Sequence, residues 1–241
     1  MFNEAYFIIF GHNTNIKKDE LIYGCQTLDE FIHLSKDFMG SVVKFIDRSW
    51  YHKLIELGFI EYAVFRDYFL NEIGDRETSN DIYEAKTTDS LAISRITRSN
   101  IGLSRSFFGD DEFFVETWIN QTNESLTFNN AKNPKIFVYK ENEIIKRCIF
   151  TAIVVENNPR GKSMWLREIS VSPEEHNKGI GRKLINHALY YAKQDGAVRS
   201  SLLADDLNVS AIHLYQKLGY MPNLEGEEIN MIVNKKELSS N

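Results

Sequence analysis

Residues 164–220 of the chain read MWLREISVSPEEHNKGIGRKLINHALYYAKQDGAVRSSLLADDLNVSAIHLYQKLGY, and this stretch decides the fold. It begins with a strand-like run over residues 164–171, followed by a polar loop that ends at Gly179 and Gly181. Apolar residues then recur at the spacing of one helix face, which predicts a helix. They are Ile180, Leu184, Ile185, Ala188, Tyr191 and Ala192. A strand therefore leads through a glycine loop into a helix.

The glycine loop has the features of an anion site. The first N–H groups of a helix have no partner within the helix, and glycines let a ligand approach them closely. The helix dipole adds partial positive charge there, and Lys178, Arg182 and Lys183 add full charges. A phosphate or pyrophosphate is the predicted ligand. A glycine pair also opens many helices for packing reasons alone, so this pattern by itself does not establish a phosphate site.

The second half of the stretch strengthens the prediction. Gly196 is placed to end the helix, and residues 197–204 read as a buried strand. Asn208 is placed to cap a second helix, which stops at Gly219. The two patterns, V-x-P-x5-G-x-G from Val171 and N-x2-A-x2-L-Y-x3-G-Y from Asn208, together resemble the acetyl-coenzyme A binding core of the GNAT N-acetyltransferase superfamily.

The resemblance implies an α+β fold, a mixed and mostly antiparallel sheet flanked by helices. The element order read from the sequence agrees: a strand at residues 81–86, two helices, an antiparallel meander over residues 135–171, then helix, strand, helix and a last strand at residues 228–233. We therefore expect a GNAT domain over residues 80–241. The polar segment 74–80, GDRETSN, is the predicted domain boundary.

Cofactor contacts are also implied by the resemblance. The pantetheine arm of acetyl-coenzyme A would lie along the end of the strand, and the Val171 N–H would polarise the thioester carbonyl. The pyrophosphate would lie in the glycine loop, whose usual first residue, Gln or Arg, is replaced here by His176. An ordinary buried strand is the alternative. The residues implied to bind the cofactor are Ile169, Ser170, Val171, Asn177, Lys178, Gly179, Ile180, Gly181, Arg182 and Asn208.

Two side chains are candidates for the chemistry. Tyr215 matches the tyrosine that protonates the leaving thiolate in many family members, although a tyrosine on an apolar helix face is also an ordinary core residue. An acceptor amine of pKa ~10.4 is neutral in only about one molecule in 2,500 at pH 7, so a base is needed. Glu168 is the candidate base, or a carboxylate that orients the ammonium through water. A pairing with Arg167 or with a neighbouring strand is the structural alternative. Direct attack in a ternary complex needs no metal.

The resemblance leaves the acceptor and the class of function open. A small-molecule amine or a protein N-terminus would serve as acceptor. A non-catalytic acyl-coenzyme A binding or regulatory module is the alternative to an enzyme, and it predicts cofactor binding without turnover. A nucleotide-binding loop is disfavoured, because the Gly-Lys-Ser/Thr ending of a P-loop and the third glycine of a dinucleotide loop are both absent.

Composition limits compartment and partners. The chain has 241 residues and a net charge of −6, which disfavours nucleic acid as a partner. Its only cysteines, Cys25 and Cys148, lack metal-ligand spacing, so neither a disulfide framework nor a zinc site is expected. No run reaches the ~20 apolar residues of a membrane span, and no secretory leader is recognisable. We expect a cytoplasmic protein.

Residues 1–75 are predicted to form a mainly helical unit. Thr27 and Glu30 have the form of a capping box, and residues 42–57 read as a further helix. The segment 50–59, WYHKLIELGF, echoes LYQKLGY at residues 214–220, as a degenerate repeat of the C-terminal part would. A lid and a homodimer surface fit this unit equally well.

Overall fold

The chain divides into two compact units. The computed structural model describes residues 6–14, 16–105, 107–155, 160–172 and 179–234. Unit 1 comprises residues 1–66 and 224–241, and unit 2 comprises residues 67–223. Two strands, β4 (Ile60–Leu70) and β10 (Met221–Ile232), contain the boundaries, so each contributes one end to each unit. Unit 1 therefore combines two distant parts of the sequence, whereas unit 2 is one continuous stretch.

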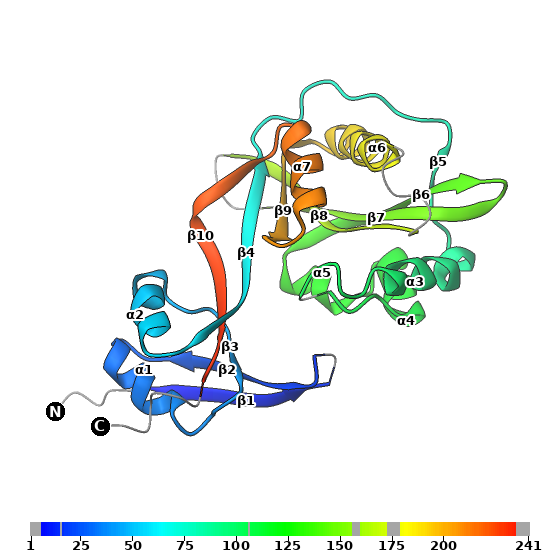
Figure 1. Ribbon diagram of the computed structural model, residues 1–241. Coiled ribbons are helices and arrows are strands. Elements are labelled where there is room, and N and C mark those ends of the chain that lie inside the picture. Colours follow the sequence, from blue (N-terminus) through cyan, green and yellow to red (C-terminus); the bar gives the residue numbers. More distant parts are fainter. Residues whose placement is uncertain (1–5, 15, 106, 156–159, 173–178, 235–241) are drawn as a thin grey trace. The chain divides into compact units, whose positions relative to one another are not determined.

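Unit 1 is a small sheet with short helices packed on it (Figure 1). Its strand order is β1-β2-β3-β10-β4, with β1–β2 antiparallel, β2–β3 parallel and β3–β10 antiparallel. Its core contains Phe31, Leu54 and Phe59. Besides β4 and β10, the elements are β1 (Phe7–Asn13), β2 (Lys18–Gly24), α1 (Leu28–Ser35), β3 (Val42–Val43), the 3-10 helix η1 (Arg48–Trp50) and α2 (Tyr51–Glu56).

The prediction of a mainly helical unit over residues 1–75 is wrong. The capping box at Thr27 and Glu30 is present and starts α1, but the helix expected over residues 42–57 is a two-residue strand, a 3-10 turn and the short α2. Residues 60–70 form a strand because their β-branched and aromatic side chains suit a pleated surface. The domain boundary also differs from the predicted segment 74–80, and the last strand lies largely in unit 1.

Unit 2 has the predicted fold class, a mostly antiparallel sheet flanked by helices. Its strand order is β4-β9-β8-β7-β6-β5; the pairs from β5 to β8 are antiparallel, and β8–β9 is parallel. The strands are β5 (Ile82–Glu84), β6 (Ala131–Glu141), β7 (Ile144–Val154), β8 (Lys162–Val171) and β9 (Ala197–Asp205). The helices are η2 (Thr87–Asp89), α3 (Ser90–Ser99), α4 (Glu112–Ile119), α5 (Glu124–Phe128), α6 (Ile180–Gln194) and α7 (Val209–Lys217).

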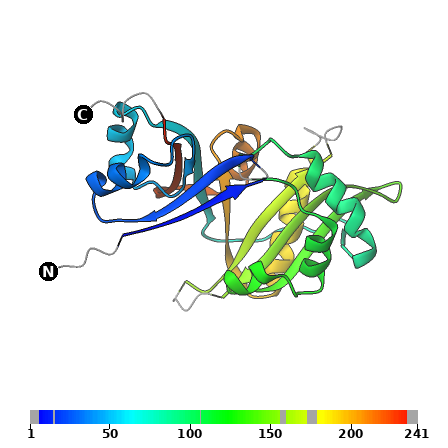
Figure 2. The ribbon, with the colours of Figure 1, turned by 90° about the horizontal axis from the view of Figure 1, so that it is seen from below.

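Two apolar clusters lie on opposite faces of the unit 2 sheet. Helices α6 and α7 cover one face, and α3, α4 and α5 cover the other (Figures 1 and 2). The first cluster includes Leu166, Leu184 and Tyr215. The second includes Trp118 and Phe150. The amphipathic pattern read for α6 is thus explained, because its apolar stripe packs on the sheet.

Among the described residues, no helix combines the length and apolar character needed to cross a bilayer. The same residues contain no cluster of three or more His, Cys, Asp or Glu arranged to hold a metal ion. Cys148 is a fully buried thiol, and burial raises its pKa well above the usual value.

Candidate active site

A β-bulge in β8 places two charged side chains on one face of the sheet. The register with β7 pairs Phe150 with Glu168 but Thr151 with Leu166, so Arg167 is the extra residue. Leu166 and Ile169 both pack in the α6 cluster, although residues three apart in a regular strand point to opposite faces. The bulge resolves this, and turns both Arg167 and Glu168 toward the face covered by α3 and α4.

Strands β8 and β9 separate next to this bulge. Their parallel register runs from Lys162–Ala197 to Trp165–Ser201 and ends there. Both strands continue, β8 to Val171 and β9 to Asp205. The residues predicted to contact the pantetheine arm, Ile169, Ser170 and Val171, therefore lie on the separated part of β8.

The start of α6 retains two glycines for different physical reasons. Gly179, the N-cap, has φ +74°, a left-handed conformation that favours glycine. A Cβ at Gly181 would lie 3.0 Å from the Leu214 side chain, so this glycine lets α6 approach α7. Arg182 is exposed beside them, and Ile180 is buried. Asn177, Lys178 and His176, which replaces the usual Gln or Arg, lie outside the described residues.

The first turn of α6 has no side-chain cap among the described residues. Its N–H groups and the helix dipole are therefore available to an anion from outside the protein. α6 has 15 residues, long enough for the dipole to develop. These features support the predicted phosphate position.

Glu168 is held by its neighbour on the same face. Ser170 Oγ donates a hydrogen bond to Glu168 Oε1 at 2.6 Å. Burial raises the pKa of Glu168 to about 7, while the Ser170 hydrogen bond and the Arg167 charge oppose that rise. A carboxyl group of this pKa accepts a proton near neutral pH, as a general base must.

Arg167 pairs with another acid. Its guanidinium makes a bidentate contact with Asp110, 2.8 Å from Nη1 to Oδ2 and 2.7 Å from Nη2 to Oδ1. It also stacks on the Phe114 ring, 4.2 Å from the centroid. The alternative in which Glu168 is merely the ion-pair partner of Arg167 is therefore not what the structure contains.

Tyr215 lies on α7 and is 6% exposed. Burial, followed by the charge of Glu168, raises its pKa above the usual range, so the phenol keeps its proton at neutral pH. Its ring packs 6.5 Å from that of Tyr68 and 6.1 Å from that of Tyr220. No residue in the described part of the chain hydrogen-bonds the Tyr215 hydroxyl, whereas a buried tyrosine usually has such a partner.

Asn208 caps α7. Its side-chain Oδ1 accepts from the Ala211 N–H at 3.4 Å. The helix that carries Tyr215 therefore starts where the N-cap pattern predicts it. The role of Asn208 toward a cofactor remains a prediction.

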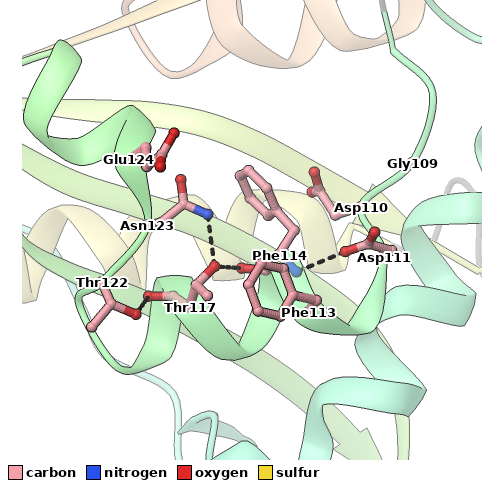
Figure 3. A pocket seen from close by; sticks show the side chains of 9 residues that line it. All are labelled: Gly109, Asp110, Asp111, Phe113, Phe114, Thr117, Thr122, Asn123 and Glu124. Carbon is pink, nitrogen blue, oxygen red and sulfur yellow. Dashed lines mark hydrogen bonds between the residues drawn. The ribbon is translucent and has the colours of Figure 1, made fainter.

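A pocket of about 440 Å³ adjoins the Asp110–Arg167 pair on the α4 side (Figure 3). Two of its three acids have structural partners: Asp110 binds Arg167, and Asp111 accepts from the Phe114 N–H at 2.7 Å as the cap of α4. Asn123 donates to Thr117 Oγ1 at 2.9 Å. Asp110 and Asp111 thus have structural roles, and Glu112 lies in the first turn of α4, where a negative charge suits the helix dipole.

Comparison with known proteins agrees with this geometry. Residues 104–220 match the sequence model of the Acetyltransferase (GNAT) family. The chain is 38% identical over 57 residues to streptothricin acetyltransferase of Streptomyces lavendulae, an alignment covering 24% of this chain and 30% of that protein. It is 37% identical over 59 residues to N-acetyltransferase family 8 member 3 of Rattus norvegicus, covering 24% and 26%. The chain thus spans less than a third of the length of these two curated relatives.

Solved structures share the fold. A GCN5-related N-acetyltransferase from Sphaerobacter thermophilus superposes with a TM-score of 0.60 and 12% identity, covering 97% of this chain and 77% of that one. A conserved protein from Staphylococcus epidermidis has a TM-score of 0.57 and 18% identity, covering 98% and 93%. Residues 104–220 are thus similar in sequence to the GNAT family, the family that the motifs resemble.

Proposed function

We propose that the chain is an N-acetyltransferase that moves an acetyl group from acetyl-coenzyme A to a primary amine. The observation that carries the proposal is the position of Glu168 and Tyr215. The charge of Glu168 adds to burial in raising the pKa of Tyr215, and Glu168 lies on the part of β8 that has separated from β9. A thioester lying in that separation would have a base on the acceptor side and an acid on the donor side.

Cofactor binding would use backbone more than side chains. The first turn of α6, from Gly179 to Arg182, would hold the pyrophosphate, with Asn177 and Lys178 on the loop before it. Main-chain groups of Ile169, Ser170 and Val171 would hold the pantetheine arm, and the Val171 N–H would polarise the thioester carbonyl. Asn208 would contact the arm from the start of α7.

The reaction would proceed by direct attack in a ternary complex. Glu168 takes a proton from the acceptor ammonium, because direct reaction of the rare neutral amine would forfeit roughly 4.6 kcal/mol at pH 7. The amine nitrogen attacks the carbonyl carbon, and the C–S bond breaks. Tyr215 gives its proton to the departing thiolate, and the second proton lost by the attacking nitrogen restores the neutral Tyr215. This last role is supported by the buried hydroxyl of Tyr215, which has no hydrogen-bond partner among the described residues.

The test has two stages. Calorimetry with acetyl-coenzyme A, ATP and NAD should give binding of acetyl-coenzyme A alone, and no binding below millimolar would refute the proposal. Thiol release should then be followed with streptothricin, spermidine and an alanine-terminated peptide. Streptothricin is included because of the name of one relative. Binding without turnover of any primary amine would favour the non-catalytic acyl-coenzyme A binding module.

A further inference from the structure

The segment between α3 and α4, residues 100–110, is tied to the ends of both separated strands. At its start, Asn100 Nδ2 donates to the Val171 carbonyl at the end of β8, at 3.0 Å. At its end, Asp110 holds Arg167 in the bulge. Between these points, Arg105 binds Asp205 at the end of β9. The segment thus links the two strands beyond the point where their register stops.

The contact between Arg105 and Asp205 is the strongest of these ties. The Arg105 backbone N–H donates to Asp205 Oδ2 at 2.7 Å, and the guanidinium Nη2 donates to Oδ1 at 2.6 Å. Nε adds contacts at 3.0 and 3.2 Å. The Asp205 side chain is fully buried, and the Arg105 side chain is 22% exposed. Charge-assisted bidentate contacts of this kind fix geometry as well as adding energy.

Asp205 also shapes the turn that leads into α7. Its Oδ1 accepts from the Leu207 N–H at 3.0 Å, and its carbonyl accepts from the Asn208 N–H at 2.8 Å. One carboxylate therefore joins the 100–110 segment to the turn that precedes Asn208. The other end of the segment reaches Arg167, the immediate neighbour of Glu168.

We infer that Arg105 and Asp205 are a positioning pair that fixes segment 100–110 beside Glu168 and so orients the acceptor amine. The inference rests on the proposed function. It follows because Glu168 faces the α3 and α4 side of the sheet, and the segment that connects those helices binds Arg167 and Val171, which lie on either side of Glu168 in β8. Small displacements of such a border reduce the rate strongly, because attack requires near-contact alignment.

The test is the Arg105→Met variant. It removes the guanidinium but keeps the backbone bond to Asp205 and the bond from Asp205 to Leu207. We expect the acceptor KM to rise about ten-fold, while the Kd for acetyl-coenzyme A stays within about two-fold. Arg105→Lys keeps the charge but loses the bidentate fork, so its acceptor KM should lie between those of the wild type and Arg105→Met. The acceptor KM is measured with each amine that the wild type acetylates among streptothricin, spermidine and the alanine-terminated peptide.

Two further variants separate positioning from stability. Arg105→Met leaves a buried carboxylate without its cation, so Arg105→Met/Asp205→Asn should recover Tm but not acceptor KM. The control is Lys193→Met. It removes the ion pair that Lys193, in the last turn of α6, makes with Asp75. It should change neither the acceptor KM nor the Kd for acetyl-coenzyme A.

An unchanged acceptor KM in Arg105→Met would overturn the inference, as would a parallel loss of acetyl-coenzyme A affinity and Tm. A wild-type chain that binds acetyl-coenzyme A without turnover would refute the proposed function and this inference with it. An active wild type with an insensitive Arg105→Met would refute the inference alone.

Discussion

Helices α1 and α6 both come after a strand that pairs in parallel with the strand after the helix, yet their first turns differ. In unit 1, Glu30 Oε2 accepts from the N–H groups of Gln26 and Thr27, each at 3.0 Å. The protein's own carboxylate thus occupies the positive end of α1. In unit 2, α6 begins at Gly179 with no side-chain cap among the described residues. The same local architecture is closed in one unit and open to an anion in the other.

A second pair of elements differs in the same way. Helices α2 and α7 are each followed by a glycine with positive φ, Gly58 at +92° and Gly219 at +96°, and then by a strand. Four residues before the glycine, α7 carries Tyr215 and α2 carries the fully buried Leu54. This parallel supports the degenerate-repeat interpretation of the N-terminal part, which stays a prediction. At this position α2 has an apolar side chain where α7 has a phenol.

The largest expected effect concerns Tyr215. Tyr215→Phe should lower kcat about 100-fold, because general acid catalysis of the leaving group is lost, and should leave the Kd for acetyl-coenzyme A unchanged. Steady-state kinetics and calorimetry measure the two constants. Tyr220→Phe is the matched control, since the Tyr220 hydroxyl is engaged 2.7 Å from Ser200 Oγ. Equal kcat values for wild type and Tyr215→Phe would mean that Tyr215 is not the acid, and that α7 has no chemical role that α2 lacks.

The next effect tests whether the open helix can be closed. Arg182 occupies the third position of α6, the place that Glu30 has in α1. Arg182→Glu should weaken acetyl-coenzyme A binding about ten-fold, because a carboxylate there repels the phosphates and competes for the same N–H groups. Lys193→Glu makes the same charge change in the last turn of α6 and should bind normally. Equal weakening in both would point to net charge and away from the helix start.

A smaller effect concerns the pH profile of Glu168. In the wild type kcat/KM should rise with pH up to about 7 and then level off, because the base acts in its ionised form. The Ser170 hydrogen bond stabilises that form, so Ser170→Ala should raise the pKa of Glu168 and move the rising limb to higher pH. If the rising limb of the kcat/KM profile stays at the same pH in Ser170→Ala, a group other than Glu168 sets that pH dependence.

The smallest effect belongs to unit 1. Glu30→Gln should reduce stability by about 1 kcal/mol through loss of the charged capping box, as measured by urea unfolding. Acetyl-coenzyme A binding should not change. A change in acetyl-coenzyme A affinity would mean that unit 1 takes part in the cofactor site after all.

Much of unit 2 could be predicted from the sequence, because local signals and the fold agree there. The apolar stripe from Ile180 to Ala192 keeps the helical spacing, and the cap at Asn208 is a contact within a few residues. The sequence predicts a helical unit 1, wrongly, because the dense apolar run at residues 59–73 has no clear periodicity. Its buried positions alternate at Ala63 and Phe65 and again at Tyr68 and Leu70, with a shift between the two pairs. Local reading fails where tertiary packing decides.

The site was predictable only in part for the same reason. Arg167 and Glu168 are adjacent in the sequence, and only the bulge, a feature of strand pairing, puts them on one face. Arg105 and Asp205 are 100 residues apart, and neither belongs to a motif. Their one sequence signal is the position of Asp205 at the end of a predicted buried strand, which names no partner.

The measurement that tests the account most directly is the stoichiometry of acetyl-coenzyme A binding to the intact chain by titration calorimetry. The open start of α6 and the self-capped start of α1 predict one site per chain, weakened in Arg182→Glu and unchanged in Glu30→Gln. Two sites, or one site that Arg182→Glu leaves at full affinity, would contradict it.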